Sequence, residues 1–250
     1  KAKRFITPHD DLEALEKALK EAQSARHRLF ITDGVFSMEG KVARLAELAD
    51  LCSRYDCTFV IDDSHATGVL GPTGRGSAEE LGVMESVDLY TGTLGKAMGS
   101  AAGGFTTGPS AVVELLRQRS RTSLFSNSLP PAVTASSLEA FRMLMEDPSP
   151  VARLRANAHT FRRRMSEVGF RIPEGIHPIV PVIVGDTAKA LAMSAALFEK
   201  GVYVSGFGFP VVPQGHARLR CQISAVHTDE DLDEAVRAFT DVGREFGAIS

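Results

Sequence analysis

The sequence predicts an α/β protein in which helices cover a parallel β-sheet. Two segments, 26–34 and 57–63, are predicted as short buried strands, because each has an apolar stretch that ends at an aspartate. Between them, residues 41–56 have apolar side chains at helical spacing. Apolar strands that alternate with helices are typical of a parallel sheet covered on both faces.

The other segments of the first half fit the same class of fold. Residues 10–22 predict a helix, with Leu12, Leu15 and Leu19 on one face and acidic residues in the first turn. We expect two further short strands, over 87–93 and 103–108, and then a helix over 110–118.

The second half of the sequence has a different pattern, in which longer helices are predicted and the strands lie further apart in the chain. Prolines open a predicted helix over 129–146, and Gly169 ends the next one, over 151–169. Strands over 177–185 and 216–224 and helices over 187–201 and 227–239 follow, the last with Thr228 as its N-cap and Asp231 at N3. We expect two domains, residues 1–130 and 131–250.

Composition and charge exclude several classes of function. The chain has 250 residues and a formal net charge of −3, so no overall field favours nucleic acid or a membrane surface. Basic runs at 117–121 and 162–164 lie in helical patterns, and we interpret them as solvated faces. The three cysteines have no metal-ligand spacing and are expected to be reduced thiols. No apolar run reaches the length of a membrane span, and we expect a cytoplasmic protein, or a mitochondrial one in a eukaryote.

Polar residues follow three of the predicted strands. They are Asp33 and Ser37 after the first, Asp62, Asp63, Ser64 and His65 after the second, and Thr91, Thr93 and Lys96 at the third. In an open parallel sheet the carboxyl ends of the strands meet at one edge, which is where ligands bind. The sequence therefore predicts a site at this edge.

The sequence does not match the motifs of three common kinds of functional site. A nucleotide P-loop would need glycine at Tyr90 and serine or threonine at Ala97. A metal site is disfavoured because no second histidine or carboxylate cluster stands near 62–65, and no G-x-S-x-G elbow occurs for a serine hydrolase. Taken singly, Asp62 and His65 could also be solvated loop residues.

Lys96 is the more specific signal, because it lies among small residues in "GTLGKAMGSAAGG" (92–104). Such a lysine can attack carbonyl groups, and pyridoxal 5′-phosphate (PLP) requires one, together with a carboxylate for its ring nitrogen and donors for its phosphate. Asp62 would suit the nitrogen, His65 the 3′-oxygen and Thr93 the phosphate.

Five strings resemble the α-oxoamine synthases: "TDGVFSMEG" (32–40), "DDSHATGVLGPTGRGS" (62–77), "GTLGKAMGSAAGG" (92–104), "LFSNSLPP" (124–131) and "ARLRCQISAVHT" (217–228). The resemblance implies a fold-type I PLP-dependent transferase of the aspartate aminotransferase-like fold, with part of the large domain followed by a small α+β domain. It runs from end to end of this chain, and family members are longer at the amino end, so we expect a carboxyl-terminal portion.

The resemblance also implies roles for single residues. Lys96 would form the Schiff base with PLP, Asp62 would face the ring nitrogen, and His65, helped by Ser37, would face the 3′-oxygen. Thr93 would bind phosphate, and Ser126 and Asn127 would reach the phosphate of the neighbouring subunit's cofactor, which implies a homodimer with shared sites. Arg220 would bind the carboxylate of the substrate, for which a guanidinium is the natural partner.

Within the family, "LFSNSLPP" and the region around 208–220 are most similar to the branch that condenses glycine with acetyl-CoA, releasing CoA and 2-amino-3-oxobutanoate, or runs the reverse cleavage in threonine catabolism. The first alternative is another α-oxoamine synthase with a longer acyl-CoA. The second is a non-catalytic chain of the same fold.

Overall fold

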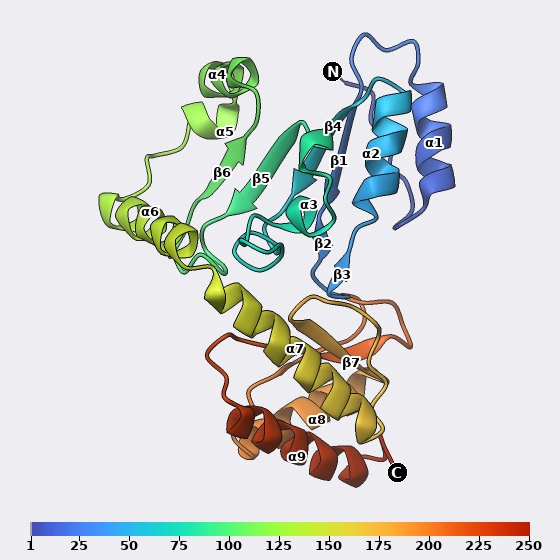
Figure 1. Ribbon diagram of the computed structural model, residues 1–250. Helices are drawn as coiled ribbons and strands as arrows, with labels where there is room; N and C mark the ends of the chain where they lie inside the picture. Colours follow the sequence, from blue (N-terminus) through green and yellow to red (C-terminus); the bar gives the residue numbers. More distant parts are fainter. Residues whose placement is uncertain (1) are drawn as a thin grey trace. The chain divides into compact units, whose positions relative to one another are not determined.

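A four-stranded sheet organises the first of two compact units in the computed structural model, which describes residues 2–250. Its strands are β1 (Leu29–Asp33), β4 (Thr58–Asp62), β5 (Leu89–Thr93) and β6 (Gly104–Thr107), in the order β1-β4-β5-β6 (Figure 1). The first three are parallel and β6 is antiparallel to β5, so the expected parallel arrangement is confirmed for β1, β4 and β5.

Helices flank this sheet. They are α1 (Leu12–Glu21), α2 (Leu45–Arg54), α3 (Ser77–Glu80), the short 3₁₀ helix η1 (Met84–Ser86), α4 (Ser110–Arg119), α5 (Arg121–Leu124) and α6 (Pro131–Glu146). Helix α1 begins after Asp11, whose carboxylate accepts a hydrogen bond from the Ala14 N–H at 2.9 Å. Leu45 of α2 and Phe59 and Ile61 of β4 are fully buried, so α2 and β4 supply part of the core under the sheet.

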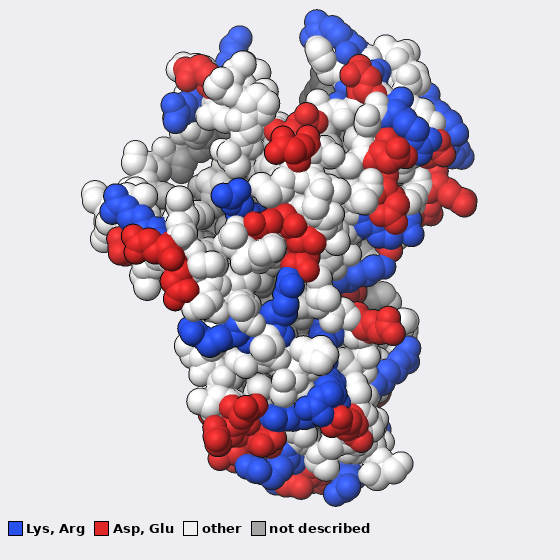
Figure 2. Space-filling model, in the orientation of Figure 1, with Lys and Arg blue, Asp and Glu red and all other residues white. Residues whose placement is uncertain are grey.

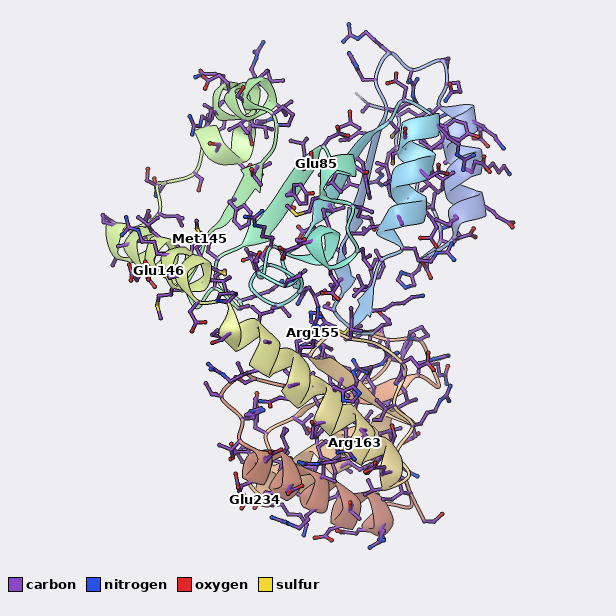
Figure 3. All side chains as sticks on the ribbon, in the orientation of Figure 1. Glu85, Met145, Glu146, Arg155, Arg163 and Glu234 are labelled. Atoms are coloured by element: carbon purple, nitrogen blue, oxygen red, sulfur yellow. The ribbon has the colours of Figure 1, made fainter. Side chains whose placement is uncertain are left out.

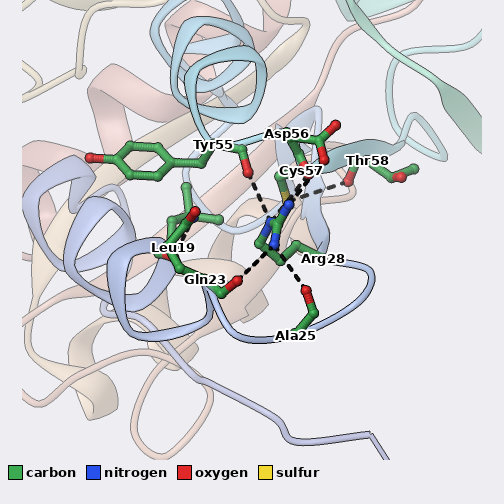
Figure 4. Close-up of polar contacts among 8 residues, drawn as sticks. All are labelled: Leu19, Gln23, Ala25, Arg28, Tyr55, Asp56, Cys57 and Thr58. Atoms are coloured by element: carbon green, nitrogen blue, oxygen red, sulfur yellow. Dashed lines mark hydrogen bonds and ion pairs between the residues drawn. The ribbon is translucent and has the colours of Figure 1, made fainter.

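Arg28, just before β1, holds the preceding loop in place through several hydrogen bonds (Figure 4). Its guanidinium donates to the carbonyl oxygens of Tyr55 at 2.8 Å and Ala25 at 3.0 Å, and pairs with the Asp56 carboxylate at 3.0 Å. These contacts join the loop before β1 to the turn before β4, and so bring the starts of two neighbouring parallel strands together.

The second unit is built on a three-stranded antiparallel sheet with the order β7-β9-β8, formed by β7 (Ile179–Gly185), β8 (Ser205–Phe207) and β9 (Ala217–Gln222). Its helices are α7 (Ser149–Glu167), α8 (Thr187–Glu199) and α9 (Asp229–Glu245). Phe161, Phe170 and Phe239 meet edge to face in its core. Thr228 and Asp231 form the expected capping box at the start of α9.

A short segment from the first half of the chain also belongs to the second unit. Residues 36–42 run from the end of β2 (Val35–Phe36) through β3 (Lys41–Val42). They are held by Arg218 of β9, which donates to the Met38 carbonyl at 2.9 Å and lies 3.6 Å from the Glu39 carboxylate. A Cβ on Gly40 would meet the Ile179 carbonyl oxygen, so glycine is required for this close approach.

The compact units divide the chain after Pro148, apart from the segment 36–42, and the expected domains 1–130 and 131–250 stay a prediction. Helix α6 belongs to the first unit, because the hydroxyls of Ser137 and Ser100 are hydrogen-bonded at 2.6 Å and the Phe141 ring packs against the edge of Phe105. The second unit therefore begins at Ser149, apart from the segment 36–42.

The basic run at 162–164 is not wholly a solvated face. Arg163 is exposed on α7 (Figure 3) and pairs with Glu167 at 2.7 Å, as expected for the surface. Arg162 instead turns inward and donates to the carbonyl oxygens of Pro173, His177 and Ile179. The spacing of charges alone could not indicate this, because those carbonyls belong to the loop that follows the helix and to the start of β7.

Acidic and basic side chains are interspersed over the face of the molecule shown in Figure 2, in keeping with the small net charge. Over residues 2–250, no helix combines the length and apolar character that a membrane crossing requires.

Candidate active site

The ends of β1, β4 and β5 bring the polar residues of the first unit together. Asp33 lies opposite Asp62, and Asp62 lies opposite Thr91, in the register of the parallel strands. Lys96 follows β5 in a tight turn, and its Nζ lies 3.0 Å from Nε2 of His65. Two of the predicted site residues are thus in direct contact, and Asp62 is close enough to Lys96 for their charges to interact.

Asp62 is held by two donors on its two oxygens. The Ser64 N–H donates to Oδ1 at 2.8 Å, and the Thr91 hydroxyl donates to Oδ2 at 2.9 Å. Burial alone raises the pKa of this carboxyl, but the hydrogen bonds from Ser64 and Thr91 and the charge of Lys96 together hold it below its ordinary value. The geometry therefore provides an ionised carboxylate in a half-buried position.

Asp63, the next residue, has a different environment. Its side chain is buried, and its oxygens accept hydrogen bonds from the Ser77 hydroxyl and, at 2.9 Å, from the Ser77 N–H. Burial outweighs these bonds and raises the pKa of Asp63 to about 6. A Cβ on Gly34 or Gly76 would collide with this carboxylate, so it is enclosed by backbone. Of the two adjacent acids, Asp62 is the one available to a ligand.

The turn that carries Lys96 is closed by its own hydrogen bonds. The Leu94 N–H donates to the Gly103 carbonyl at 2.9 Å, and the Gly99 N–H donates to the Lys96 carbonyl at 3.0 Å. Gly99 has φ +71°, and a Cβ there would meet nothing within 4 Å. The small residues thus leave open space beside an exposed lysine that stands on a well-defined turn.

Thr93 takes part in closing this turn. Its hydroxyl donates to the Gly103 carbonyl at 3.2 Å and accepts from the Gly95 N–H at 3.3 Å. The hydroxyl would have to redirect its proton to bind a phosphate oxygen, so its predicted phosphate role stays a prediction.

Asp33 is a neighbour of this site to which the sequence assigned no role. Its pKa is raised by partial desolvation and by the Asp62 carboxylate, and Lys96 opposes this shift. Ser64 and Thr91 likewise had no predicted role, although both stand at strand ends. Their position at the strand ends was the sequence signal that could have identified them. In the structure, both donate hydrogen bonds to Asp62.

Arg220 and Ser37 lie together in the second unit. The half-buried guanidinium of Arg220 donates from Nε to the Ser37 carbonyl at 2.8 Å. Burial lowers the pKa of Arg220, yet a guanidinium stays charged at neutral pH. This bond to the Ser37 carbonyl uses Nε and does not involve the two Nη atoms. A pair of Nη atoms can bind a carboxylate in a bidentate contact. The expected assistance of Ser37 to His65 stays a prediction.

Ser126 and Asn127 are exposed in the segment between α5 and α6. The Ser126 hydroxyl donates to the Asn127 carbonyl at 3.3 Å. Exposure is what a residue that reaches a neighbouring subunit needs, and the predicted role of this pair stays a prediction.

Two other features of residues 2–250 lie outside this arrangement. A cavity of about 950 Å³ is lined by 2–7, α1, the following loop and β1, and its lining contains none of the predicted site residues. Within the same range, no group of three or more histidine, cysteine, aspartate or glutamate side chains could hold a metal ion.

Comparisons with known proteins agree with this fold. Human 2-amino-3-ketobutyrate coenzyme A ligase, mitochondrial, is 50% identical over 249 residues, covering 100% of this chain and 59% of the relative. The 8-amino-7-oxononanoate synthase of Symbiobacterium thermophilum is 45% identical and is covered to 64%. The chain thus spans about 60% of the length of the curated relatives it matches.

Solved structures match the fold. Serine palmitoyltransferase of Sphingomonas wittichii has a TM-score of 0.92 at 32% identity, covering 97% of this chain and 61% of that one. A structure described as SPT with PLP also has a TM-score of 0.92 at 32% identity. The match covers 96% of this chain and 61% of that chain.

This fold, with a lysine on the turn after β5 and an aspartate at the end of β4, is that of the fold-type I PLP-dependent transferases. The aminotransferase class I and II family model matches residues 3–239, and the chain belongs to that family.

Proposed function

We propose that the protein containing this chain is a PLP-dependent acyltransferase that condenses glycine with acetyl-CoA to 2-amino-3-oxobutanoate and CoA, or catalyses the reverse cleavage in threonine catabolism. The contact of Lys96 Nζ with His65 beside the ionised Asp62 carboxylate is the observation that carries this proposal. The name of the human relative supports the choice of reaction within the family.

The residues present fit PLP. Lys96 is exposed and its Nζ contacts His65, and Asp62 is an ionised acceptor for a protonated ring nitrogen. Lys96 would hold the cofactor, Asp62 would face the ring nitrogen, and His65, helped by Ser37, would face the 3′-oxygen. Thr93, with Ser126 and Asn127 of the other subunit of a homodimer, would bind the phosphate. When bound there, PLP would stabilise the negative charge that develops on the substrate carbon.

The chain's own groups have separable tasks in the reaction. Arg220 binds the carboxylate of glycine through its Nη atoms. Lys96 Nζ, once the amine of glycine has replaced it on the cofactor, would be the base that takes the proton from the α-carbon of glycine. The Asp62 carboxylate keeps the proton on the ring nitrogen, because its two donors hold it in the charged form.

The test uses the full-length protein and begins with its colour. We expect a PLP absorbance in the visible or near ultraviolet, and borohydride followed by peptide mapping should place the label on Lys96. Lys96→Ala should abolish both the absorbance and turnover, whereas Lys17→Ala, at an exposed position of α1, should change neither. Full activity in Lys96→Ala would refute the assignment, and a colourless wild-type protein would favour a non-catalytic chain.

The nearest alternative is another α-oxoamine synthase with a longer acyl-CoA, favoured by the similarity to 8-amino-7-oxononanoate synthase. Turnover of acetyl-CoA against longer acyl-CoA thioesters, at fixed glycine, separates the two. We also propose that the protein acts in the cytoplasm of a bacterium or in the mitochondrion of a eukaryote, the compartment in the human relative's name.

A further inference from the structure

The Asp62 carboxylate depends on a donor from the neighbouring strand. Thr91 of β5 is its partner in the strand register, and the Thr91 hydroxyl reaches Oδ2 at 2.9 Å. The other oxygen, Oδ1, accepts a backbone N–H from Ser64 at 2.8 Å. A substitution cannot remove that backbone donor. The side chains of Ser64 and Thr91 both help to hold the Asp62 pKa down, and Thr91 is the one that reaches Asp62 from the neighbouring strand.

The two contacts together fix the carboxylate in space. One donor on each oxygen sets the rotation of the carboxyl plane about the bond to Cβ, whereas a single donor would leave the group free to turn. Because each donor contributes a proton to the bond, both favour the ionised carboxylate over the acid. A charged group also forms stronger hydrogen bonds than a neutral one.

We propose that Thr91 is a positioning residue that aims the Asp62 carboxylate and keeps it ionised for the ring nitrogen of PLP. This inference rests on the proposed function, since it gives Asp62 the role assigned there. Thr91 itself touches neither substrate nor cofactor in this role and acts only through Asp62.

Other charged and titratable groups face Asp62 and stay unchanged in the test. They are Asp33 at the end of β1, Asp63 next in the chain, Lys96 after β5, and His65, which contacts Lys96. Lys96 favours the ionised form of Asp62 and the two carboxylates oppose it. Removal of the Thr91 hydroxyl should therefore raise the Asp62 pKa without altering the rest of the cluster.

The experiment measures PLP affinity and the absorbance of the holoenzyme against pH in the full-length protein. PLP affinity should fall at acid pH as Asp62 becomes protonated. Thr91→Val keeps the β-branched shape and removes the donor, so we expect this acid limb to move up by about 1 to 2 pH units, the equivalent of one lost hydrogen bond to a charged group. Turnover at neutral pH should fall by about tenfold.

Three further variants make the test specific. Thr91→Ser keeps the hydroxyl and should retain the wild-type limb, and Thr91→Cys, with its weaker thiol donor, should lie between Ser and Val. Thr106→Val changes an exposed threonine opposite Thr91 on β6 and should have no effect. If Thr91→Val does not fold, the comparison of Thr91→Cys with Thr91→Ser takes its place.

An acid limb that stays in place in Thr91→Val, or in Thr91→Cys where Val does not fold, would overturn the proposal. Equal shifts in Thr91→Ser and Thr91→Val, or a shift in Thr106→Val, would do the same. These outcomes differ from a failure of the proposed function, in which the wild-type protein itself would bind no PLP.

Discussion

At the scale of single residues, the adjacent acids Asp62 and Asp63 have opposite environments, and this separates their expected contributions. Asp62 is half-buried beside Lys96, whereas Asp63 is enclosed and bound by Ser77. Successive side chains at the end of a strand point to opposite sides, so the two carboxylates cannot serve the same ligand.

The first prediction compares Asp62→Asn with Asp63→Asn. Asp62→Asn removes the charge that we propose faces the ring nitrogen of PLP, and it should lower turnover by about a hundredfold or more, which is about 3 kcal/mol of barrier. Asp63→Asn should do much less to turnover but should lower the free energy of unfolding by about 1–3 kcal/mol, because an amide has one acceptor oxygen for the two donors of Ser77. Kinetics and urea unfolding of both variants are the measurements. Equal losses of turnover would show that the wrong acid has been chosen.

A second prediction at this scale concerns Arg220. Arg220→Lys replaces a bidentate guanidinium by a single ammonium, and the Nε anchor on the Ser37 carbonyl is lost with it. Losing one charge-assisted hydrogen bond costs about 1.5–3 kcal/mol, so glycine affinity should fall by about ten- to a hundredfold while PLP stays bound. The spectral change of the holoenzyme during a glycine titration gives the midpoint. An unchanged midpoint, or loss of PLP, would refute a carboxylate-binding role.

At the scale of elements, the buried Asp63 carboxylate joins the end of β4 to the start of α3. The Ser77 N–H and hydroxyl both donate to it, and the Asp63 carbonyl accepts from the Thr67 hydroxyl at 3.0 Å. The loop between these elements, which contains Ser64 and His65, is thus fixed at both ends. His65, which contacts Lys96, lies in this loop.

This connection should respond to pH in a defined direction. The pKa of Asp63 is raised from 3.8 to about 6, so its contribution to stability is fully present below about pH 4 and is lost as the pH rises through 6. The loss is on the order of 3 kcal/mol for a shift of about two pH units. The difference in unfolding free energy between the wild type and the non-titrating Asp63→Asn should therefore become less favourable to the wild type from pH 4 to pH 7. A difference that is constant with pH would show that the carboxyl titrates normally.

At the scale of the whole molecule, local patterns in the sequence predicted most of the elements. The strands near 29–33 and 58–62 are apolar before their aspartates, and the cap at Thr228 needs only neighbouring residues. The short strands β2, β3 and β8 have two or three residues each, too few for a period to appear. The inward turn of Arg162 was missed because its partners are carbonyls, which carry no sequence signal.

The candidate site was also predictable in part from local patterns in the sequence. Strand ends indicated where Asp62, His65 and Lys96 would meet, since parallel strands share an edge. Asp62 was assigned to the ring nitrogen from its place at the strand end, and the resemblance then favoured it over Asp63. The alternation of side chains separates the two acids without indicating which one faces the ligand. The membership of residues 36–42 in the second unit could not be predicted, because Arg218 lies 180 residues from Met38.

The last prediction tests that long-range connection. Arg218 is buried, donates to the carbonyls of Met38 at 2.9 Å and His216 at 3.1 Å, and lies 3.6 Å from the Glu39 carboxylate. Arg218→Lys cannot make all these contacts with one ammonium, so the opening free energy of the segment 36–42 should fall by about 1–3 kcal/mol.

Amide hydrogen exchange of the full-length protein gives this opening free energy directly. Exchange within 36–42 should accelerate in Arg218→Lys, and the glycine midpoint should rise because the Ser37 carbonyl that anchors Arg220 loses its support. Arg163→Lys, an exposed change on α7, should alter neither quantity. Unchanged exchange in Arg218→Lys would mean that the β2–β3 turn is stable without this arginine, and the position of Arg220 would then depend on β9 alone.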